Sequence, residues 1–318
     1  QVSGQMDFGM GSVVGMLLLL PSLVSIYIER VAAQRQFGAS SENLIPVTPA
    51  RMPLRDTLLG GACLLVAATI AAVVAVVVFA SFVKLWPYNL SFTLKNYNVD
   101  TSDGYASLWT SLKISLVAAT LGVALLFLLT FGARRLSGGA AKAVYLLAVL
   151  PAGVPGLVLG LSYIFAFNVP NSPLYILYGS AILIAICNFY HYHTQGFLTM
   201  MTGMRSVPAA LEEAVSCFGG NLRCVLRDAV LPFMAPTVLS VFFFLFMRSM
   251  VTLSAVIFLV TPTVNVASVA VMRLDQAGFV SQAAAFSTWI MLIVGGALLA
   301  MRLLLSRVGR RPGPAGRT

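Results

Sequence analysis

Seven long runs of apolar residues, separated by shorter polar stretches, set the pattern of the chain. They cover approximately residues 8–28, 58–83, 109–133, 143–167, 174–199, 233–259 and 283–306. Each has about 20 to 25 residues, the length that an α-helix needs to cross the ~30 Å hydrocarbon core of a bilayer. The runs lack the strict apolar/polar alternation of a membrane β-strand, so helices remain the way to satisfy the backbone in lipid. The pattern predicts an all-α integral membrane protein.

Composition agrees with this fold class. Of the 318 residues, 59% are apolar and 9% are charged, whereas about a quarter of a soluble domain is charged. The net charge of +10 does not require a nucleic-acid partner, because basic residues gather at the cytoplasmic ends of membrane helices. The four cysteines, Cys63, Cys187, Cys217 and Cys224, form no CxxC pair, so we expect neither a disulfide framework nor a metal site.

The basic residues also predict the orientation. They concentrate in a linker at 30–57, in a short loop at 134–142 and in a tail at 309–318, and the positive-inside rule places these segments in the cytoplasm. The region 58–308 then forms a six-helix unit with both ends, including the C-terminus, in the cytoplasm. A polar segment at 200–232 falls on the same face.

The first apolar run forms an extra transmembrane helix within residues 1–29. Residue 1 is Gln rather than Met, so we expect this helix to be the last one of an upstream unit in a longer tandem chain. The alternative is an artefact of where the sequence was cut.

The polar segment 200–232 carries the clearest local signals. Ser206 and Pro208 resemble a helix start, and Gly219-Gly220 resembles a helix stop, since glycine tolerates the left-handed conformation that follows a helix. Asn221 can cap a second short helix that runs to Leu231 and breaks before Pro232. We therefore expect a helix, a glycine turn and a second helix along the membrane surface.

Two adjacent carboxylates, Glu212 and Glu213, lie on the first of these helices. Neighbouring helix residues point about 100° apart, so the pair cannot share one catalytic site. A helix that only lies on lipid usually carries Lys or Arg on its polar face. A docking helix for a cytoplasmic partner fits better.

The spacing of this segment resembles the cytoplasmic loop of ABC importer permeases, which reads EAA, three residues, Gly, nine residues, then Ile-x-Leu-Pro. Here Glu213-Ala214-Val215 is followed by Gly219 and then by Ala229-Val230-Leu231-Pro232, so Val215 and Ala229 depart from the pattern. The resemblance implies that the loop enters a cleft of an ATPase subunit and couples it to the membrane helices. The implied coupling residues are Glu212, Glu213, Ala214, Gly219, Leu231 and Pro232.

A second resemblance covers about residues 86–285. The stretches WPYNLSFTLKNY, LPAGVPGLVLGLSYIFAFN, FMRSMVTLSAVIFL and ASVAVMRLDQAGFVSQAAA are similar to the second half of tandem permeases for 2-aminoethylphosphonate, with ferric-iron permeases as close relatives. It implies a bacterial inner-membrane importer with two ATPase subunits, a second permease unit, a periplasmic binding protein and no cofactor.

The sequence has no GxxxxGK[ST] phosphate-binding loop. We therefore expect a transport subunit that is not itself an enzyme.

Arg248 falls well inside the apolar run at 233–259. An intramembrane cation usually faces a bundle interior or a watery passage, and Arg248 with Ser249, Thr252 and Ser254 can line a pathway for a phosphonate. Alternatively Arg248 lies near a helix end, and the hydroxyls bond to their own or a neighbouring helix.

Two further patterns in the apolar runs remain open. His191 and His193 cannot share a helix face, so an interfacial role beside Tyr190 and Tyr192 is preferred to a metal pair. The Pro/Gly-rich stretch at 151–160 predicts close packing and a kink, with gating as the alternative.

Two other classes of function fit less well. An ion-coupled secondary transporter would carry carboxylates within its spans, and the central regions of the six spans have no Asp or Glu. A membrane-embedded enzyme would need a cluster of nucleophile, base or acid residues, which the pattern lacks.

Overall fold

The structure, a computed structural model, describes residues 52–98 and 104–308, together with Val13, Met16, Leu17, Leu20, Pro21, Val24 and Ile28. These seven positions are helical and exposed. The remainder of the expected extra helix, the expected linker up to residue 51 and the basic tail at 309–318 lie outside the described residues.

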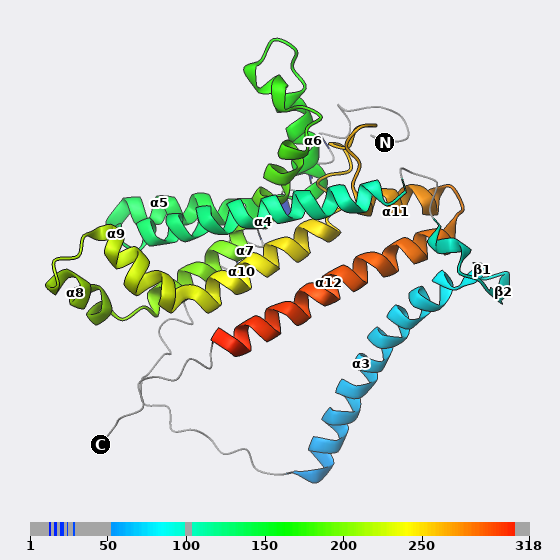
Figure 1. The fold of residues 1–318 in the computed structure, drawn as a ribbon, viewed down its shortest axis with the longest axis horizontal. Helices are drawn as coiled ribbons and strands as arrows, with labels where there is room; N and C mark the ends of the chain where they lie inside the picture. Colours follow the sequence, from blue (N-terminus) through cyan, green and yellow to red (C-terminus); the bar gives the residue numbers. More distant parts are fainter. Residues whose placement is uncertain are drawn as a thin grey trace.

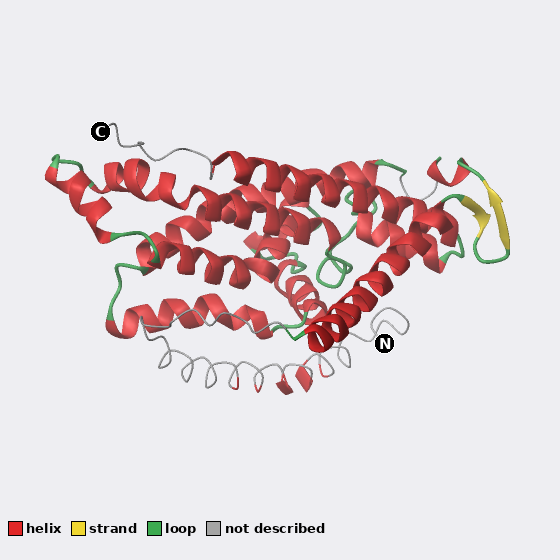
Figure 2. Ribbon diagram, turned by 90° about the horizontal axis from the view of Figure 1, so that it is seen from below, coloured by secondary structure: helices red, strands yellow, loops and turns green. Residues whose placement is uncertain are grey.

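The described chain is a bundle of helices with one small hairpin (Figures 1 and 2). Its α-helices are α3 (Pro53–Ser81), α4 (Ala106–Ala133), α5 (Gly138–Val149), α6 (Gly156–Phe167), α7 (Ala181–Arg205), α8 (Ala209–Cys217), α9 (Leu222–Cys224), α10 (Leu231–Val251), α11 (Ala267–Gln276) and α12 (Val280–Val308). Short 3₁₀ turns cover Lys95–Tyr97, Leu150–Gly153 and Pro173–Leu177, and a π-helical segment covers Val225–Val230. Strands β1 (Val83–Leu85) and β2 (Asn89–Phe92) pair antiparallel.

The centre of the bundle is the packing of α4, α7 and α10. Leu126, Phe197 and Met234 from these three helices are almost completely buried in one cluster. Glycines allow the close approach: a Cβ added at Gly122 would lie 2.5 Å from Phe189 Cδ2, and one at Gly196 would lie 2.7 Å from Leu126 Cδ1. Small residues have this role at helix contacts in membranes, where apolar burial alone cannot drive association.

Four helices in the described residues are long and apolar enough to cross a membrane: α3, α4, the continuous helix Leu222–Val251, and α12. A fifth results if α5 and α6, which are bent by 106°, count as one span. α7 has 25 residues but is not among the four; it carries polar residues such as Asn188 and His191. The expected count of six spans plus one is therefore not confirmed.

The expected single helix over 143–167 is wrong. The chain leaves the helix after α5, and Val154 is extended at φ −90° and ψ 115° before α6 begins at Gly156. Proline explains the break, because Pro155 disfavours helical backbone at the residue before it, and Pro151 has no N–H to donate. The kink expected from the Pro/Gly-rich stretch is a full break.

The expected helix over 233–259 is too long at its C-terminal end. α10 ends at Val251, and residues 252–266 are irregular, with Thr252 extended at ψ 125°. This stretch is rich in Thr, Val and Ile and includes Pro262. β-Branched residues and proline are poor helix formers.

The hairpin β1–β2 follows α3, in a chain expected to be all-α. Asn96 is buried and donates hydrogen bonds to the carbonyl oxygens of Ser81 and Val83, at 3.0 and 2.7 Å. The hairpin and α8 lie at opposite ends of the bundle (Figure 1).

Candidate functional site

α8 stands out from the bundle beyond the end of α7 (Figure 1), and none of its residues is buried. The expected cap at Ser206 is wrong. Ser206 has helical backbone (φ −81°, ψ −7°) as the C-cap of α7, and its Oγ donates to the Gly203 carbonyl at 2.7 Å. An N-cap residue is normally extended, and this position belongs to Pro208, whose φ and ψ are −64° and 134°.

The turn after α8 follows the expected chemistry. Gly219 has φ +77°, and the amides of Gly219 and Gly220 donate to the carbonyls of Ser216 and Val215 at 2.9 and 3.0 Å. This is the glycine-dependent ending of a helix. Asn221 then caps α9, its Oδ1 accepting from the amides of Arg223 and Cys224 at 3.0 and 3.1 Å. The expected stop at the glycine pair and the expected cap are confirmed.

The expected break before Pro232 is wrong. α9, the π-helical segment and α10 form one continuous helix over Leu222–Val251. Pro232 lies in the first turn of α10, directly after the π-helical segment. Wider i→i+5 bonding shifts the register of the backbone acceptors. We attribute the tolerance of Pro232, which lacks an N–H, to that shift.

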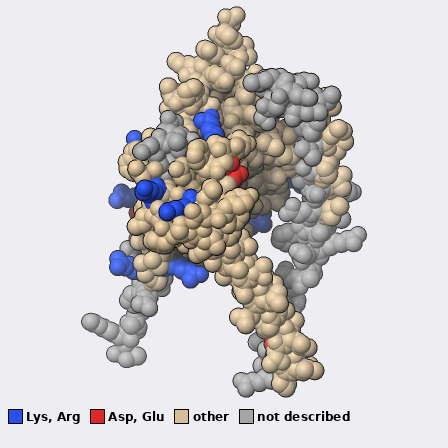
Figure 3. All heavy atoms as spheres, turned by 90° about the vertical axis from the view of Figure 1, so that its right-hand side faces the viewer, with Lys and Arg blue, Asp and Glu red and all other residues tan. Residues whose placement is uncertain are grey.

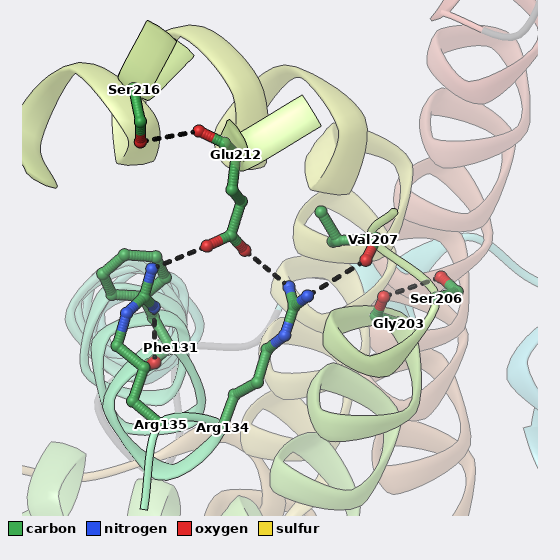
Figure 4. Close-up of polar contacts among 8 residues, drawn as sticks. All are labelled: Phe131, Arg134, Arg135, Gly203, Ser206, Val207, Glu212 and Ser216. Carbon is green, nitrogen blue, oxygen red and sulfur yellow. Dashed lines mark hydrogen bonds and ion pairs between the residues drawn. The ribbon is translucent and has the colours of Figure 1, made fainter. Parts of the chain in front are cut away.

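Glu212 holds α8 against the C-terminal end of α4 (Figure 4). Its Oε2 accepts from Arg135 Nη2 at 2.9 Å, and its Oε1 lies 2.8 Å from Arg134 Nη1. The second contact is an ion pair and not a hydrogen bond, because the two atoms are close but poorly aligned. The three side chains are 22% to 34% exposed, so water screens these pairs less than pairs at a free surface.

The two arginines also bind backbone oxygens. Arg134 Nη2 donates to the Val207 carbonyl, and Arg135 Nη1 donates to the Phe131 carbonyl, both at 3.1 Å. The Arg135 guanidinium lies 3.8 Å from the centroid of the Phe131 ring. Cations at a helix C-terminus meet free carbonyls and a favourable dipole. The pair therefore ties together α4, α8 and the connection from α7.

Sequence reasoning used Arg134 and Arg135 only as markers of orientation. Their pairing with Glu212 joins residues far apart in the sequence, at |i−j| of 77 for Arg135. The available signal was a pair of cations at a helix end in a chain with very few carboxylates.

Other expected residues of the segment lie at the surface of the described structure. Glu213, Ala214 and Gly219 are exposed, and Phe218 is 93% exposed. Leu231 is 42% exposed, beside the buried Val230. Glu212 and Glu213 thus point to different surroundings, as their helix spacing predicts. Phe218 was not singled out from the sequence.

The expected pathway residues gather where α10 ends. Arg248 lies in the last turn of α10 and is exposed, whereas Ser249 and Thr252 are buried. Asn188 Nδ2 donates to Ser249 Oγ at 2.7 Å, and Thr252 Oγ1 lies 3.2 Å from Tyr192 OH. The structure thus brings Arg248, Ser249 and Thr252 against α7.

Ser254 lies in the irregular stretch after α10, two residues beyond Thr252. It packs against the first residue of α6: a Cβ added at Gly156 would lie 2.2 Å from Ser254 Oγ and 3.2 Å from His191 Cε1.

The two histidines of α7 have internal contacts. His193 is 8% exposed, and its Nδ1 lies 2.8 Å from the Tyr190 carbonyl oxygen. His191 is half-buried beside Gly156 and Ser254. Across residues 52–98 and 104–308, no group of three His, Cys, Asp or Glu side chains is placed to hold a metal ion.

Known proteins give a consistent comparison. No family model matches the sequence. A protein assigned as a ferric transport system permease in Haemophilus influenzae is 31% identical over 270 residues, which are 82% of this chain and 42% of that protein. A protein assigned as a 2-aminoethylphosphonate transport system permease in Salmonella typhimurium is 28% identical over 248 residues, 75% of this chain and 89% of that one.

The chain thus spans less than half the length of the ferric relative from Haemophilus influenzae. In fold it matches a chain of a bacterial ABC transporter involved in the import of alginate. The TM-score is 0.63 at 16% identity, over 81% of this chain and 97% of that one. By sequence, the chain is a homologue of the permeases of ABC transport systems, and its fold is similar to that of an ABC transporter chain.

Proposed function

We propose that the chain is the permease component of an ATP-driven ABC importer in a bacterial inner membrane, and that α8 is its contact with an ATPase subunit. One observation carries this proposal: α8 is fixed on its inner side through Glu212 while Glu213 and Phe218 remain free. A helix that is anchored on one side and exposed on the other can receive a partner and pass on its movement.

The free side of α8 fits a protein partner. Phe218 is 93% exposed and Leu222, just beyond the glycine turn, is 57% exposed. Burying an aromatic side chain contributes about 2 kcal/mol or more to association, and aromatic anchors dominate many interfaces. Glu213 adds a negative charge that would select a donor-rich or basic surface.

Two sets of contacts on the inner side of α8 can transmit a movement of α8 to the rest of the bundle. Glu212 links α8 to α4 through Arg134 and Arg135. Val215 packs on the main hydrophobic cluster, which includes Val225 and Val230 of the π-helical segment that leads into α10. A shift of α8 would therefore act on α4 and α10, the helices at the centre of the bundle. Packed bundles respond to such shifts by switching between discrete arrangements.

The energy source would be separate subunits, since the chain has no phosphate-binding loop of the Walker type. We expect two ATPase subunits, a second permease unit and a periplasmic binding protein, with the C-terminus in the cytoplasm. These expectations follow from the ABC importer resemblance of the loop over 200–232.

For the solute we propose 2-aminoethylphosphonate or a related phosphonate, passing Arg248, Ser249, Thr252 and Ser254. A relative of phosphonate type is covered over 89% of its length. Ferric iron is the second candidate, because the relative at 31% identity carries that name.

The test of the coupling role replaces Phe218 by Ala and measures how much ATPase subunit co-purifies with the permease and how fast the complex hydrolyses ATP. Tyr88→Ala is the matched control, since Tyr88 is 86% exposed in the hairpin at the opposite end. We expect Phe218→Ala alone to lose most of the bound ATPase. Equal retention of the ATPase by both variants would overturn the assignment of α8.

A further inference from the structure

Two breaks in the helices meet at one place in the bundle. The first residues of α6, after the break at 150–155, pack against the irregular stretch that follows α10. A Cβ at Gly156 would lie 2.2 Å from Ser254 Oγ, and one at Gly160 would lie 2.4 Å from the Ala255 carbonyl oxygen. Irregular backbone at membrane depth is tolerated where protein buries it or where it lines a watery cavity. Broken helices also form solute sites in transporters.

A cation that pairs with no carboxylate of the described residues lies beside this junction. Arg248 is exposed at the end of α10, with its Cζ 5.3 Å from the centroid of Tyr192 and 5.8 Å from that of Phe244. Within the ranges 52–98 and 104–308, its guanidinium forms no ion pair or hydrogen bond with protein. Ring faces attract a cation but leave its five N–H donors without acceptors.

The groups around Arg248 include further polar atoms that can bind a solute. His191 Nδ1 is buried without a partner among the described residues, and the His191 ring lies 4.5 Å from that of Tyr192. The Tyr192 hydroxyl and Thr252 Oγ1 are 3.2 Å apart. Buried polar atoms without partners are rare in proteins, so one that occurs beside an unneutralised cation needs an explanation.

We propose that Arg248, Tyr192 and His191 form a binding point for the oxyanion group of a solute, such as a phosphonate or phosphate. Arg248 would supply a two-pronged, charge-assisted contact, and the Tyr192 hydroxyl and His191 would supply directed hydrogen bonds. This inference rests on the proposed permease function, and it adds Tyr192 and His191 to Arg248 as the residues that would bind the oxyanion group. An unchelated ferric ion would be repelled by Arg248.

The test measures binding of 2-aminoethylphosphonate and of inorganic phosphate to the purified chain in lipid nanodiscs by ³¹P NMR line broadening. Arg248→Gln should weaken phosphonate binding about tenfold or more, the loss expected for one charged hydrogen-bonding group. Tyr192→Phe should cause a smaller loss. Arg248→Lys should recover part of the affinity, because it restores the charge without the two-pronged geometry. Arg302→Gln, the same change at an exposed arginine of α12, should bind as the unaltered chain does.

Two outcomes would overturn the oxyanion site. One is equal affinity of the Arg248→Gln and Arg302→Gln variants for phosphonate while circular dichroism shows both folded. The other is absence of phosphonate and phosphate binding by the unaltered chain. ATP hydrolysis by the complex with its ATPase is measured alongside. Its loss in the Phe218→Ala variant tests the permease proposal separately, so failure of one proposal is visible without failure of the other.

Discussion

At the scale of single residues, the two adjacent carboxylates of α8 have different surroundings and therefore different roles. Glu212 faces Arg134 and Arg135, and Glu213 faces outward. Helix geometry alone predicts that the two diverge. It does not predict which one turns inward, because that depends on where the end of α4 lies.

Glu212→Gln keeps the shape of the side chain and removes the charge that pairs with Arg134 and Arg135. We expect thermal unfolding to show a loss of about 1 kcal/mol, since partly exposed pairs contribute modestly. We expect a larger effect on coupling: ATP hydrolysis would continue with little uptake. Glu213→Gln is the matched control for stability and should leave the unfolding temperature unchanged. A lower unfolding temperature for Glu213→Gln than for Glu212→Gln would contradict this division.

Gly219→Ala should also damage the docking segment. Gly219 has φ +77°, a conformation that costs an L-residue about 1 kcal/mol or more. Space is not the problem, because nothing lies within 4 Å of an added Cβ. Gly61→Ala is the control: it too has open space, but its conformation is ordinary helix, where alanine is favoured. We predict reduced ATPase binding for the first variant only, and identical binding by both would refute the strain argument.

At the scale of elements, the apolar runs located α3, α4 and α12 to within several residues, because a spanning helix must be apolar along its whole length. α7 was located less well: it begins at Ala181 rather than at 174, and it is not among the candidate spans. The same signal failed at α5–α6 and beyond α10. The run at 233–259 stays apolar after the helix ends at Val251, and apolarity alone cannot distinguish a helix from irregular backbone buried in protein. Apolarity could not predict the hairpin either, because the hairpin depends on Asn96, which donates hydrogen bonds to the carbonyl oxygens of Ser81 and Val83.

The contact between α6 and the stretch after α10 gives a prediction for these breaks. A Cβ at Gly160 would lie 2.4 Å from the Ala255 carbonyl oxygen, and backbone cannot rotate away as a side chain can. We expect Gly160→Ala to lower stability by about 1 to 3 kcal/mol, the usual range for overpacking, and to reduce uptake. Gly295→Ala in α12, with nothing within 4 Å, should have little effect on thermal unfolding or uptake. A Gly160→Ala variant with unchanged stability and uptake would contradict this prediction, because it would show that the backbone at Ala255 moves away at little cost in free energy.

At the scale of the whole molecule, the proposed docking helix and the hairpin occupy opposite ends of the bundle, with α7 and α10 between them (Figure 1). These two helices carry the proposed oxyanion site, which consists of Arg248, Tyr192 and His191. Charge is sparse on the face drawn in Figure 3, which is mostly uncharged atoms with scattered groups of Lys and Arg. α3 diverges from the bundle, and its most apolar stretch has no buried residue. Lipid or a second permease unit would cover such a surface.

The most direct test of the account is ATP-dependent uptake in proteoliposomes that contain the permease, its ATPase and its binding protein, with 2-aminoethylphosphonate and ferric iron offered as competing solutes. We predict phosphonate uptake that requires ATP and is lost in the Phe218→Ala variant but kept in Tyr88→Ala. Iron uptake with the same ATP and Phe218 dependence would keep the coupling role of α8 and reject the oxyanion site. Uptake that proceeds without ATP, or that survives Phe218→Ala unchanged, would contradict the central claim that α8 couples ATP hydrolysis to transport.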